Sequence, residues 1–444
     1  LPALYYQNRF EMLEKYPAGV GVGYEGENQR VMHTGVKHLV VRGVSTVAQT
    51  LGGPTMPGLR GRNRAQGSVR MFYVDVGGRL ELSNLVLLEG DSSGTWGVGY
   101  NIEGVNRENG GAVHNRGVLL VGGCWFLGNY AYGVRGGAIA NYGTTKVFGS
   151  TFTKNSASYG GGSIANINEK SRTEIRFTTF DRDNSKWSTG ASLLNLRGSM
   201  WVESSQFRNS RAAYGNCFGG DVQWMKWHGG AASSIGGELN ITDSEFAQNF
   251  AMSGGGAVSL SGGAKARLVR SQFRNNSADD HVHNDASFAS SNTGASCYGI
   301  GNGGALHVDG DDTEVDIFQC AFHGNRAGAH GTSDSGEGGA VYVGGGAAAR
   351  IVGSTFVGND ATRGAGVHVK NSAALVTIES STFERNQVHP MRCTFADDLV
   401  REQEWQQPSP LFIRFDVGWS AGQHHCCGNN KGTNNCYWFS DVNK

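Results

Sequence analysis

The chain has 444 residues, and its 38 basic and 38 acidic side chains give a formal charge of zero, which points away from nucleic acid and anionic membranes. Glycine is over-represented with 69 residues, but only 7 prolines and an aromatic content of 10% exclude collagen-like and disordered glycine-rich chains. No apolar run reaches the ~18 residues of a transmembrane helix. The sequence opens at Leu1-Pro2, so we expect a processed chain or a fragment.

Residues 1–35 are expected to form an N-terminal cap for the repeats that follow. Within them, Asn8–Tyr16 is predicted to be one short helix, with Asn8 as N-cap and Pro17 ending it. The first strands are expected at His38–Arg42 and Arg70–Val76. A solenoid needs such a cap because its terminal coil otherwise exposes an open edge.

Residues 36–386 carry an internal repeat built from two alternating motifs. An F-x-x-N tetrapeptide and a G-G-A-apolar tetrapeptide follow one another, and the shortest period is about 27 residues, as between Phe180 and Phe207. The F-x-x-N copies begin at Phe126, Phe152, Phe246, Phe273, Phe322, Phe356 and Phe383, with degenerate copies at Phe180 and Phe207 and an earlier one at Leu85. The clearest G-G-A copies begin at Gly110, Gly136, Gly255, Gly303 and Gly338.

The period and the residue pattern predict an all-β fold, a right-handed parallel β-helix solenoid. Segments such as Val376–Phe383 alternate with period 2, and no helical periodicity occurs within the repeats. A propeller blade needs about 40–45 residues and four strands, so a coil of short strands fits the shorter period better. Right-handedness follows from the crossover rule for parallel strands.

Each recurring residue has an expected structural role. The phenylalanines should point inward and stack, the asparagine should occupy a corner where it bonds backbone groups and tolerates a left-handed backbone, and the paired glycines should make another corner. The position two residues before each phenylalanine should also point inward, and it is small throughout. It holds Ser83, Cys124, Ser150, Thr178, Ser205, Ser244, Ser271, Cys320, Ser354 and Ser381.

Long insertions fall only between F-x-x-N and the next glycine pair, at residues 91–109, 208–228, 277–302 and 326–337. Because stacked coils place equivalent corners in register, we expect these loops to emerge along one side and to form a binding surface. The candidate binding residues are Trp224, Trp227, His228, Asp279, Asp280, His281 and His283. A solvated polar loop is the favoured reading of the acidic segment, although Ca²⁺ could bind there; no cofactor or resident metal is otherwise expected.

The eight cysteines divide into three groups. Cys124 and Cys320 are about six coils, or ~29 Å, apart in the inward column, so they should be buried free thiols. Cys217 and Cys297 lie in insertions two coils apart and are expected to pair. The tail, residues 387–444, should be a disulfide-bearing cap or arm in which two bridges join Cys393, Cys426, Cys427 and Cys436; zinc is less favoured because adjacent cysteines poorly ligate one tetrahedral ion. Asn240 and Asn275 begin glycosylation sequons.

With GGAV, GGAI and GGAL alternating with FLGN, FTKN, FAQN and FVGN, residues 75–386 resemble the chlamydial polymorphic membrane proteins and the wider pectin-lyase-like β-helix proteins that carry this repeat. The resemblance implies a surface-exposed, generally adhesive passenger. The tail lacks the alternating strands of an outer-membrane barrel, so the resemblance implies the fold and surface location rather than a reaction.

Three functional hypotheses remain open at this stage. The first is a non-enzymatic extracellular or cell-surface structural or adhesive protein whose β-helix displays binding loops to other surface proteins or glycans. The second is a carbohydrate-active enzyme, a polysaccharide lyase or glycoside hydrolase of the pectin-lyase-like class, although its paired-aspartate motif is not found. The third, which overlaps the first, is a self-associating subunit of a filament or surface assembly.

Overall fold

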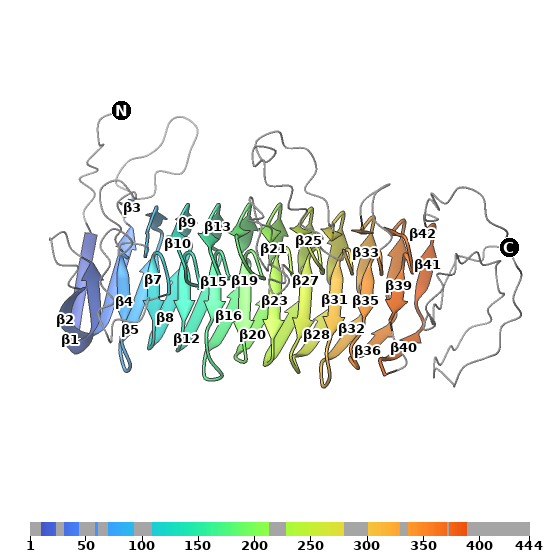
Figure 1. The fold of residues 1–444 in the computed structure, drawn as a ribbon. Helices are drawn as coiled ribbons and strands as arrows, with labels where there is room; N and C mark the ends of the chain where they lie inside the picture. The colour runs from blue at the N-terminus through green and yellow to red at the C-terminus, as the bar shows by residue number, and fades with distance from the viewer. Residues whose placement is uncertain are drawn as a thin grey trace, which may run out of the picture.

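The computed structural model describes residues 10–23, 31–43, 58–60, 70–92, 109–212, 228–278, 301–328, 336–370 and 373–388, and all regular structure in these ranges is strand. From β2 onward the strands pair in parallel, each with its equivalent in the next coil, so the chain winds into a parallel β-helix (Figure 1). The prediction of an all-β parallel solenoid is confirmed.

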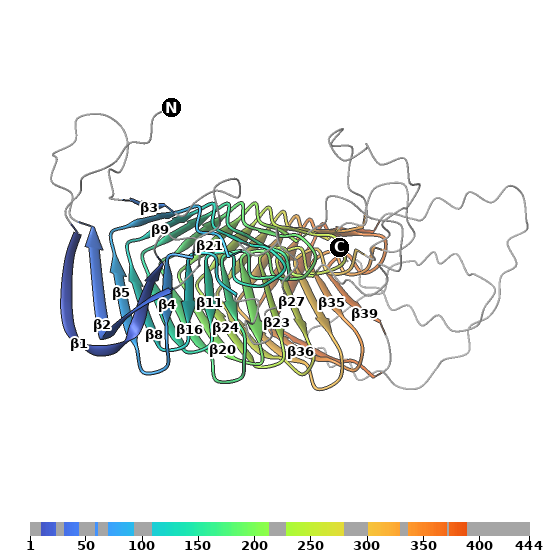
Figure 2. The ribbon, with the colours of Figure 1, turned by 60° about the vertical axis from the view of Figure 1, so that its left-hand side comes forward.

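One full coil contains four strands, as in the coil formed by β11 (Ile139–Asn141), β12 (Thr144–Phe148), β13 (Thr151–Thr153) and β14 (Ser156–Ala157). Alternation explains the longest of them: Thr145 and Val147 are buried inside the coil, while Lys146 and Phe148 face outward. Stacking of the coils therefore produces four ladders of strands, which run along the rod (Figure 2).

The ladder of long strands begins at β2 and runs to the last coil. It comprises β2 (Val31–Gly43), β5 (Arg79–Ser83), β8 (Val118–Gly122), β12, β16 (Arg172–Arg176), β20 (Ser199–Glu203), β24 (Glu238–Thr242), β28 (Lys265–Val269), β32 (Glu314–Phe318), β36 (Ala348–Val352) and β40 (Leu375–Glu379).

The ladder that precedes it in each coil has shorter strands. It comprises β4 (Phe72–Val74), β7 (Val113–Asn115), β11, β15 (Ile164–Asn166), β19 (Leu193–Leu196), β23 (Ala232–Ile235), β27 (Val258–Ser261), β31 (Leu306–Asp309), β35 (Val341–Val343) and β39 (Val367–Val369).

The phenylalanine ladder comes next along each coil. It comprises β3 (Gly58–Arg60), β6 (Val86–Leu88), β9 (Trp125–Leu127), β13, β17 (Thr179–Asp181), β21 (Gln206–Arg208), β25 (Glu245–Ala247), β29 (Gln272–Arg274), β33 (Ala321–His323), β37 (Thr355–Val357) and β41 (Thr382–Glu384).

The fourth ladder consists of two-residue strands. It comprises β10 (Tyr130–Ala131), β14, β18 (Asn184–Ser185), β22 (Arg211–Ala212), β26 (Phe250–Ala251), β30 (Ser277–Ala278), β34 (Arg326–Ala327), β38 (Asp360–Ala361) and β42 (Gln387–Val388).

The phenylalanines form one continuous stack inside the rod. Neighbouring ring centroids from Phe126 to Phe383 lie 4.5–5.0 Å apart, with interplanar angles of 14° or less. Toward the N-terminus, Leu87 pairs with Phe126 and continues the stack. The expectation that Leu85 is the early equivalent is therefore wrong by two residues, and Leu85 rather than Ser83 belongs to the small-residue column.

The asparagines of F-x-x-N are buried in a ladder of side-chain amides. Asn325 illustrates the pattern: its Nδ2 donates to Asn359 Oδ1 at 3.0 Å and to the carbonyl of Phe273 at 2.9 Å. The left-handed backbone expected at these asparagines belongs instead to the residue before each of them, such as Lys154 (φ 55°) or Gln248 (φ 57°). The asparagine stabilises that turn through its side chain.

The two glycines of each pair have different roles. Gly136 adopts φ +71°, a left-handed conformation that favours glycine, whereas a Cβ on Gly137 would lie 2.1 Å from the carbonyl oxygen of Gly162 in the next coil. The pair thus lets adjacent coils approach closely at this corner.

A second amide ladder lies inside the N-terminal half of the rod and has no counterpart in the sequence predictions. Asn115, Asn141, Asn166 and Asn195 are the third residues of successive short strands, and each amide bonds the next through Nδ2 and Oδ1 at 2.9–3.2 Å. The ladder ends where Asn195 Nδ2 donates to Ser234 Oγ.

In the part of the N-terminal cap that the structure describes, residues 10–23 and 31–35, the chain is strand, so the helix predicted at Asn8–Tyr16 is wrong. Strand β1 (Phe10–Gly23) pairs antiparallel with β2, and its last residues also pair antiparallel with β4. Local capping signals are overridden because the first coil offers two strand edges that need backbone partners. Residues 389–444, with the predicted C-terminal cap, lie outside the described residues.

Candidate functional site

The bases of the four predicted insertions lie in two columns along one side of the coil. The chain leaves the rod at Asp91, β22, β30 and β34, which belong to the ladder of two-residue strands or bridge to it. It returns at His228, Asn302 and Glu337. These three residues lie in one column, because His228 and Asn302 both form β-bridges with Gly254, and Asn302 also forms one with Glu337. These anchors are aligned as expected, while the loops themselves, like Trp224, Trp227, Asp279, Asp280, His281 and His283, lie outside the described residues.

At the return point of the last insertion, a buried carboxylate is the centre of an ion-pair cluster. The Glu337 side chain is 5% exposed, and its oxygens lie 3.1 Å from Arg363 Nη1, 3.1 Å from Lys370 Nζ and 3.9 Å from His368 Nε2. Burial lowers the pKa of His368 to about 4, with the charges of Glu337, Arg363 and Lys370 as smaller influences. The imidazole is therefore neutral near pH 7, and the carboxylate is held by two cations.

His228, the one predicted binding residue that the structure describes, belongs to this column. Its ring packs edge-on against His307 at a centroid distance of 4.6 Å, and His307 stacks on Tyr342 at 4.9 Å. Burial, followed by the charges of Glu337 and Asp309, raises the pKa of the Tyr342 hydroxyl. The sequence analysis placed His228 in a loop; the structure makes it part of the packed base of that loop.

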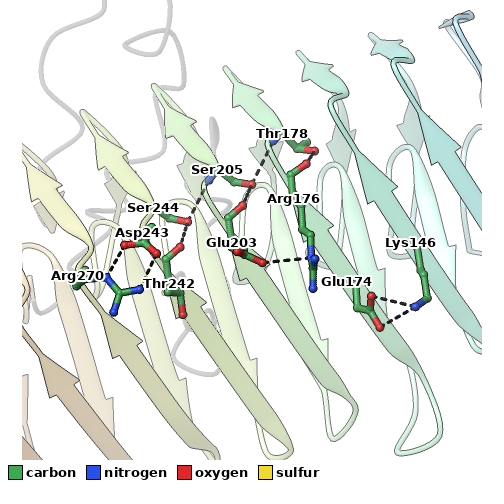
Figure 3. A network of polar contacts seen from close by, with 10 residues as sticks. All are labelled: Lys146, Glu174, Arg176, Thr178, Glu203, Ser205, Thr242, Asp243, Ser244 and Arg270. Carbon is green, nitrogen blue, oxygen red and sulfur yellow. Dashed lines mark hydrogen bonds and ion pairs between the residues drawn. The ribbon is translucent and has the colours of Figure 1, made fainter.

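The outer face of the long strands carries ion pairs that join adjacent coils (Figure 3). Lys146 pairs with Glu174 at 3.0 Å, Arg176 with Glu203 at 3.2 Å and Asp243 with Arg270 at 2.7 Å. Hydrogen bonds from Arg270 lower the pKa of Asp243. These pairs lie near the solvent, which screens their attraction, so they add little to stability.

A groove opens on the same face near its N-terminal end. Its volume is about 810 Å³, and it spans β2, β5, β8, β12 and β16. Its lining includes Arg42, Glu81, Leu120, Gly122 and Phe148. In Glu81, burial acts to raise the carboxyl pKa, but the hydrogen bonds and charges of Arg79 and His38 together outweigh it, so that the pKa is lowered. This groove was not among the features predicted from the sequence.

The small-residue column contains the two cysteines that the structure describes in detail. Cys124 and Cys320 are both 1% exposed and both unbridged, and burial raises their thiol pKa values to about 11. Each backbone N–H donates to a serine Oγ of the next coil, at Ser150 and Ser354 respectively, 3.1 Å away. Cys217, Cys297, Cys393, Cys426, Cys427 and Cys436 lie outside the described residues.

Both sequon asparagines are on the outside of the rod. Asn240 is partly exposed on β24, where its Nδ2 donates to Glu238 at 2.7 Å. Asn275 is exposed at a left-handed turn position with φ 51°. Their glycosylation remains a prediction.

Compared with known proteins, the chain matches no family model, no curated protein and no solved structure. Within the described ranges, no cluster of three or more histidine, cysteine, aspartate or glutamate side chains is arranged to hold a metal ion. Nor does any helix there have the length and apolar character needed to cross a membrane.

Proposed function

We propose that this chain is a non-enzymatic extracellular or cell-surface protein, a rigid β-helix that displays binding loops along one side. One observation carries the proposal: the anchors of all four insertions align in two neighbouring columns, while the rest of each coil keeps the same strand pairing. Loops on a rigid scaffold are where binding residues concentrate. The aligned anchors give such loops a common surface.

The packing of the loop bases supports the same function. Where the chain re-enters the rod, the buried Glu337 carboxylate is ion-paired with Arg363 and Lys370, and His228 packs against His307 at another return point. Ordered bases reduce the entropy that a loop loses on binding its partner. Two tryptophans, Trp224 and Trp227, lie in the insertion next to His228 and are suited to contact a protein or a sugar ring.

Two carboxyls on the outer face lack the raised pKa that a general acid needs. General acid catalysis by a carboxyl requires a raised pKa, whereas the pKa values of Glu81 and Asp243 are lowered by their basic neighbours. The resemblance of the GGA and F-x-x-N motifs to chlamydial polymorphic membrane proteins adds the expectation of an adhesive, surface-exposed passenger. Its partners would be other surface proteins or glycans, and a filament or surface assembly would require self-association.

The test is to shorten one loop while keeping its coil. Replacing residues 213–231 with the sequence of residues 158–163 gives this coil the short connection found between β14 and β15. Binding of the intact protein and of this variant is measured on an array of glycans and extracellular proteins. The proposal predicts loss of at least one interaction with little change in melting temperature.

A matched control is Lys265→Ala, which changes the outer face of the long strands and should leave array binding unchanged. An unaltered binding profile after loop replacement would count against the loops as the contact surface. The alternative, a polysaccharide lyase or glycoside hydrolase, predicts instead that array glycans are cleaved, and mass spectrometry of the released material detects this outcome.

A further inference from the structure

Two positions of the repeat depart from their usual residues in the same two coils. The alanine of G-G-A is replaced by Ser163 in one coil and by Ser192 in the next, and the asparagine of F-x-x-N is replaced there by Asp183 and Ser210. In every other coil from that of β7 to that of β35, both positions keep the residue of the motif. Polar side chains are thus brought together at one place inside the rod.

Ser163 has the contacts of a nucleophile. Its hydroxyl donates to Asp183 Oδ2 at 2.5 Å, and its Oγ accepts from Asn155 Nδ2 at 3.1 Å. The carbonyl carbon of the Asn155 amide is one C–N bond, about 1.33 Å, from that nitrogen, so the hydroxyl oxygen lies beside an acyl group. A hydroxyl that is hydrogen-bonded to a carboxylate base is activated for attack on such a group.

The Asn155 amide is polarised at its carbonyl oxygen. Its Oδ1 accepts from the backbone N–H of Asn129 and from Asn129 Nδ2, both at 2.9 Å. Two donors aimed at one oxygen stabilise the negative charge that develops there when a nucleophile adds to the carbonyl. The amide nitrogen also lies 3.4 Å from Asp183 Oδ1, so the carboxyl group is next to the atom that would depart.

The three side chains are enclosed by the rod. Asn155 and Ser163 are 0% exposed, and Asp183 is 1% exposed. Burial raises the pKa of Asp183 to about 7, although the hydrogen bond from Ser163 acts to lower it. A carboxyl that titrates near neutral pH can both accept a proton and return it. Exclusion of water also protects an ester at this place from hydrolysis.

We propose that Ser163 and Asn155 form an intramolecular ester. Ser163 Oγ adds to Asn155 Cγ while Asp183 Oδ2 takes the hydroxyl proton, and the Asn129 donors stabilise the oxyanion on Oδ1. The C–N bond of the amide then breaks, Asp183 returns the proton to the departing nitrogen, and ammonia leaves. One ester and one ammonia are formed, and Asp183 regains its starting state, so the reaction needs no co-reactant.

The ester joins two successive coils across β14, because Asn155 precedes this strand and Ser163 follows it. The folded chain holds the two groups in contact, which favours reaction between them over any competing intermolecular step. The reaction occurs once within the chain and turns over no substrate. It is therefore independent of the proposed binding by loops, and either proposal can fail without the other.

The first experiment measures the mass of one tryptic peptide from the full-length chain. Trypsin cleaves after Lys154 and Lys170, so residues 155–170 carry both partners. We expect this peptide to be lighter than its sequence mass by about 17 Da, the mass of ammonia. The unmodified mass would overturn the proposal.

Chymotrypsin then distinguishes the ester from ammonia loss by cyclisation of an asparagine on its own backbone. It cleaves after Tyr159, which lies between the two partners. The ester keeps the two halves of the peptide joined after this cleavage. Halves that separate, with the mass loss on one of them, would contradict the cross-link.

Variants of the full-length chain test the two roles. Ser163→Ala removes the nucleophile and Asp183→Asn removes the base, and each introduces the residue that most other coils carry, so both should fold. Both should give the peptide at its unmodified mass. Ser192→Ala is the matched control, because it changes the same motif position one coil farther along, and it should keep the mass loss.

Two outcomes would contradict the assigned roles. Mass loss that persists in Ser163→Ala or in Asp183→Asn would mean that the hydroxyl or the carboxylate takes no part. A link between residues 155–170 and residues 183–186, formed with loss of water, would mean that Asp183 rather than Asn155 is the acyl group.

Discussion

The two halves of the rod fill the same interior position in different ways. In the N-terminal half the third residue of the short strands is Asn115, Asn141, Asn166 or Asn195, and these amides bond one another from coil to coil. In the C-terminal half the same column holds Leu260, Val308, Val343 and Val369, all 5% exposed or less. Both fillings keep the strands in register.

The difference shows that an interior column is stable with either amide or apolar side chains, provided that neighbouring coils carry the same kind. A stacked amide is stable because the coil below supplies an acceptor and the coil above a donor, whereas a stacked valine is stabilised by apolar burial. An asparagine placed in the apolar half of this column, or an apolar residue placed in the amide half, should therefore destabilise the rod.

The largest effect is expected for Val343→Asn. The new amide would lie between Val308 and Val369, lose apolar burial and find no amide partner in either neighbouring coil. The two contributions together should lower the free energy of unfolding by about 4 kcal/mol. Denaturant titration measures it against Val269→Asn, whose side chain faces outward and should change stability by under about 1 kcal/mol.

A somewhat smaller loss is expected for Asn141→Leu. The change removes the acceptor of Asn115 Nδ2 and of the Gly143 N–H, and the donor to Asn166 Oδ1. Orphaned buried groups should cost about 3 kcal/mol. The same substitution at Asn240, which faces outward, is the control, and equal effects at the two positions would show that the inner ladder adds no stability.

The fold was largely predictable because its strongest signals are periodic. Phenylalanine at one strand position and paired glycines at one corner repeat through the chain, and both roles are found in the structure. The amide ladder of the short strands also has a signal in the sequence, since an asparagine follows the G-G-A motif at Asn115 and Asn141. The prediction considered only the asparagines of F-x-x-N, which repeat more often. The prediction of a helix at Asn8–Tyr16 failed because pairing of β1 with β2 and β4 outweighed the local preference for a helix N-cap.

The groove could not be predicted from the sequence pattern. It depends on Ser83 and Gly122 lying between Arg42 and Phe148, and insertions of different length separate these residues along the chain. Only the register of the coils brings them together. The Glu337 cluster depends in the same way on pairing across coils.

The third prediction concerns Asp183, which replaces the asparagine of F-x-x-N in the coil of Phe180. Burial raises its pKa to about 7, although Ser163, Asn155 and Ser192 donate hydrogen bonds to it. Because the folded-state pKa is higher than the unfolded value of 3.8, its contribution to stability is complete below about pH 4 and is lost as the pH rises through 7.

The melting temperature should accordingly fall as the pH rises from about 4 to about 7, and Asp183→Asn should reduce that fall. Asparagine at this position is the residue that the neighbouring coil carries at Asn155, so the variant should fold. Melting curves of the two proteins across this pH range measure the difference. Superimposable pH profiles would mean that the carboxyl does not titrate differently in the folded chain.

The smallest effect is expected for Cys320→Ser. Serine at Ser271 and Ser354 already fills this column in the adjacent coils, so the free energy of unfolding should change by less than about 1 kcal/mol. The native thiols of Cys124 and Cys320 should not react with a thiol reagent at pH 8, because burial raises their pKa values to about 11. Denatured, unreduced chain should expose two free thiols; none would contradict their placement, and six or more would exclude the expected disulfides.

The most direct test of the central claim, that this rod binds without catalysing a reaction, is mass spectrometry of glycans incubated with the intact protein. Pectate, polygalacturonate and sialylated oligosaccharides are each incubated with the protein, with and without Ca²⁺. We predict that every glycan mass is unchanged after prolonged incubation. Unsaturated or hydrolysed fragments that disappear in the Gly122→Trp or Glu337→Gln variant would contradict the claim and identify an enzyme.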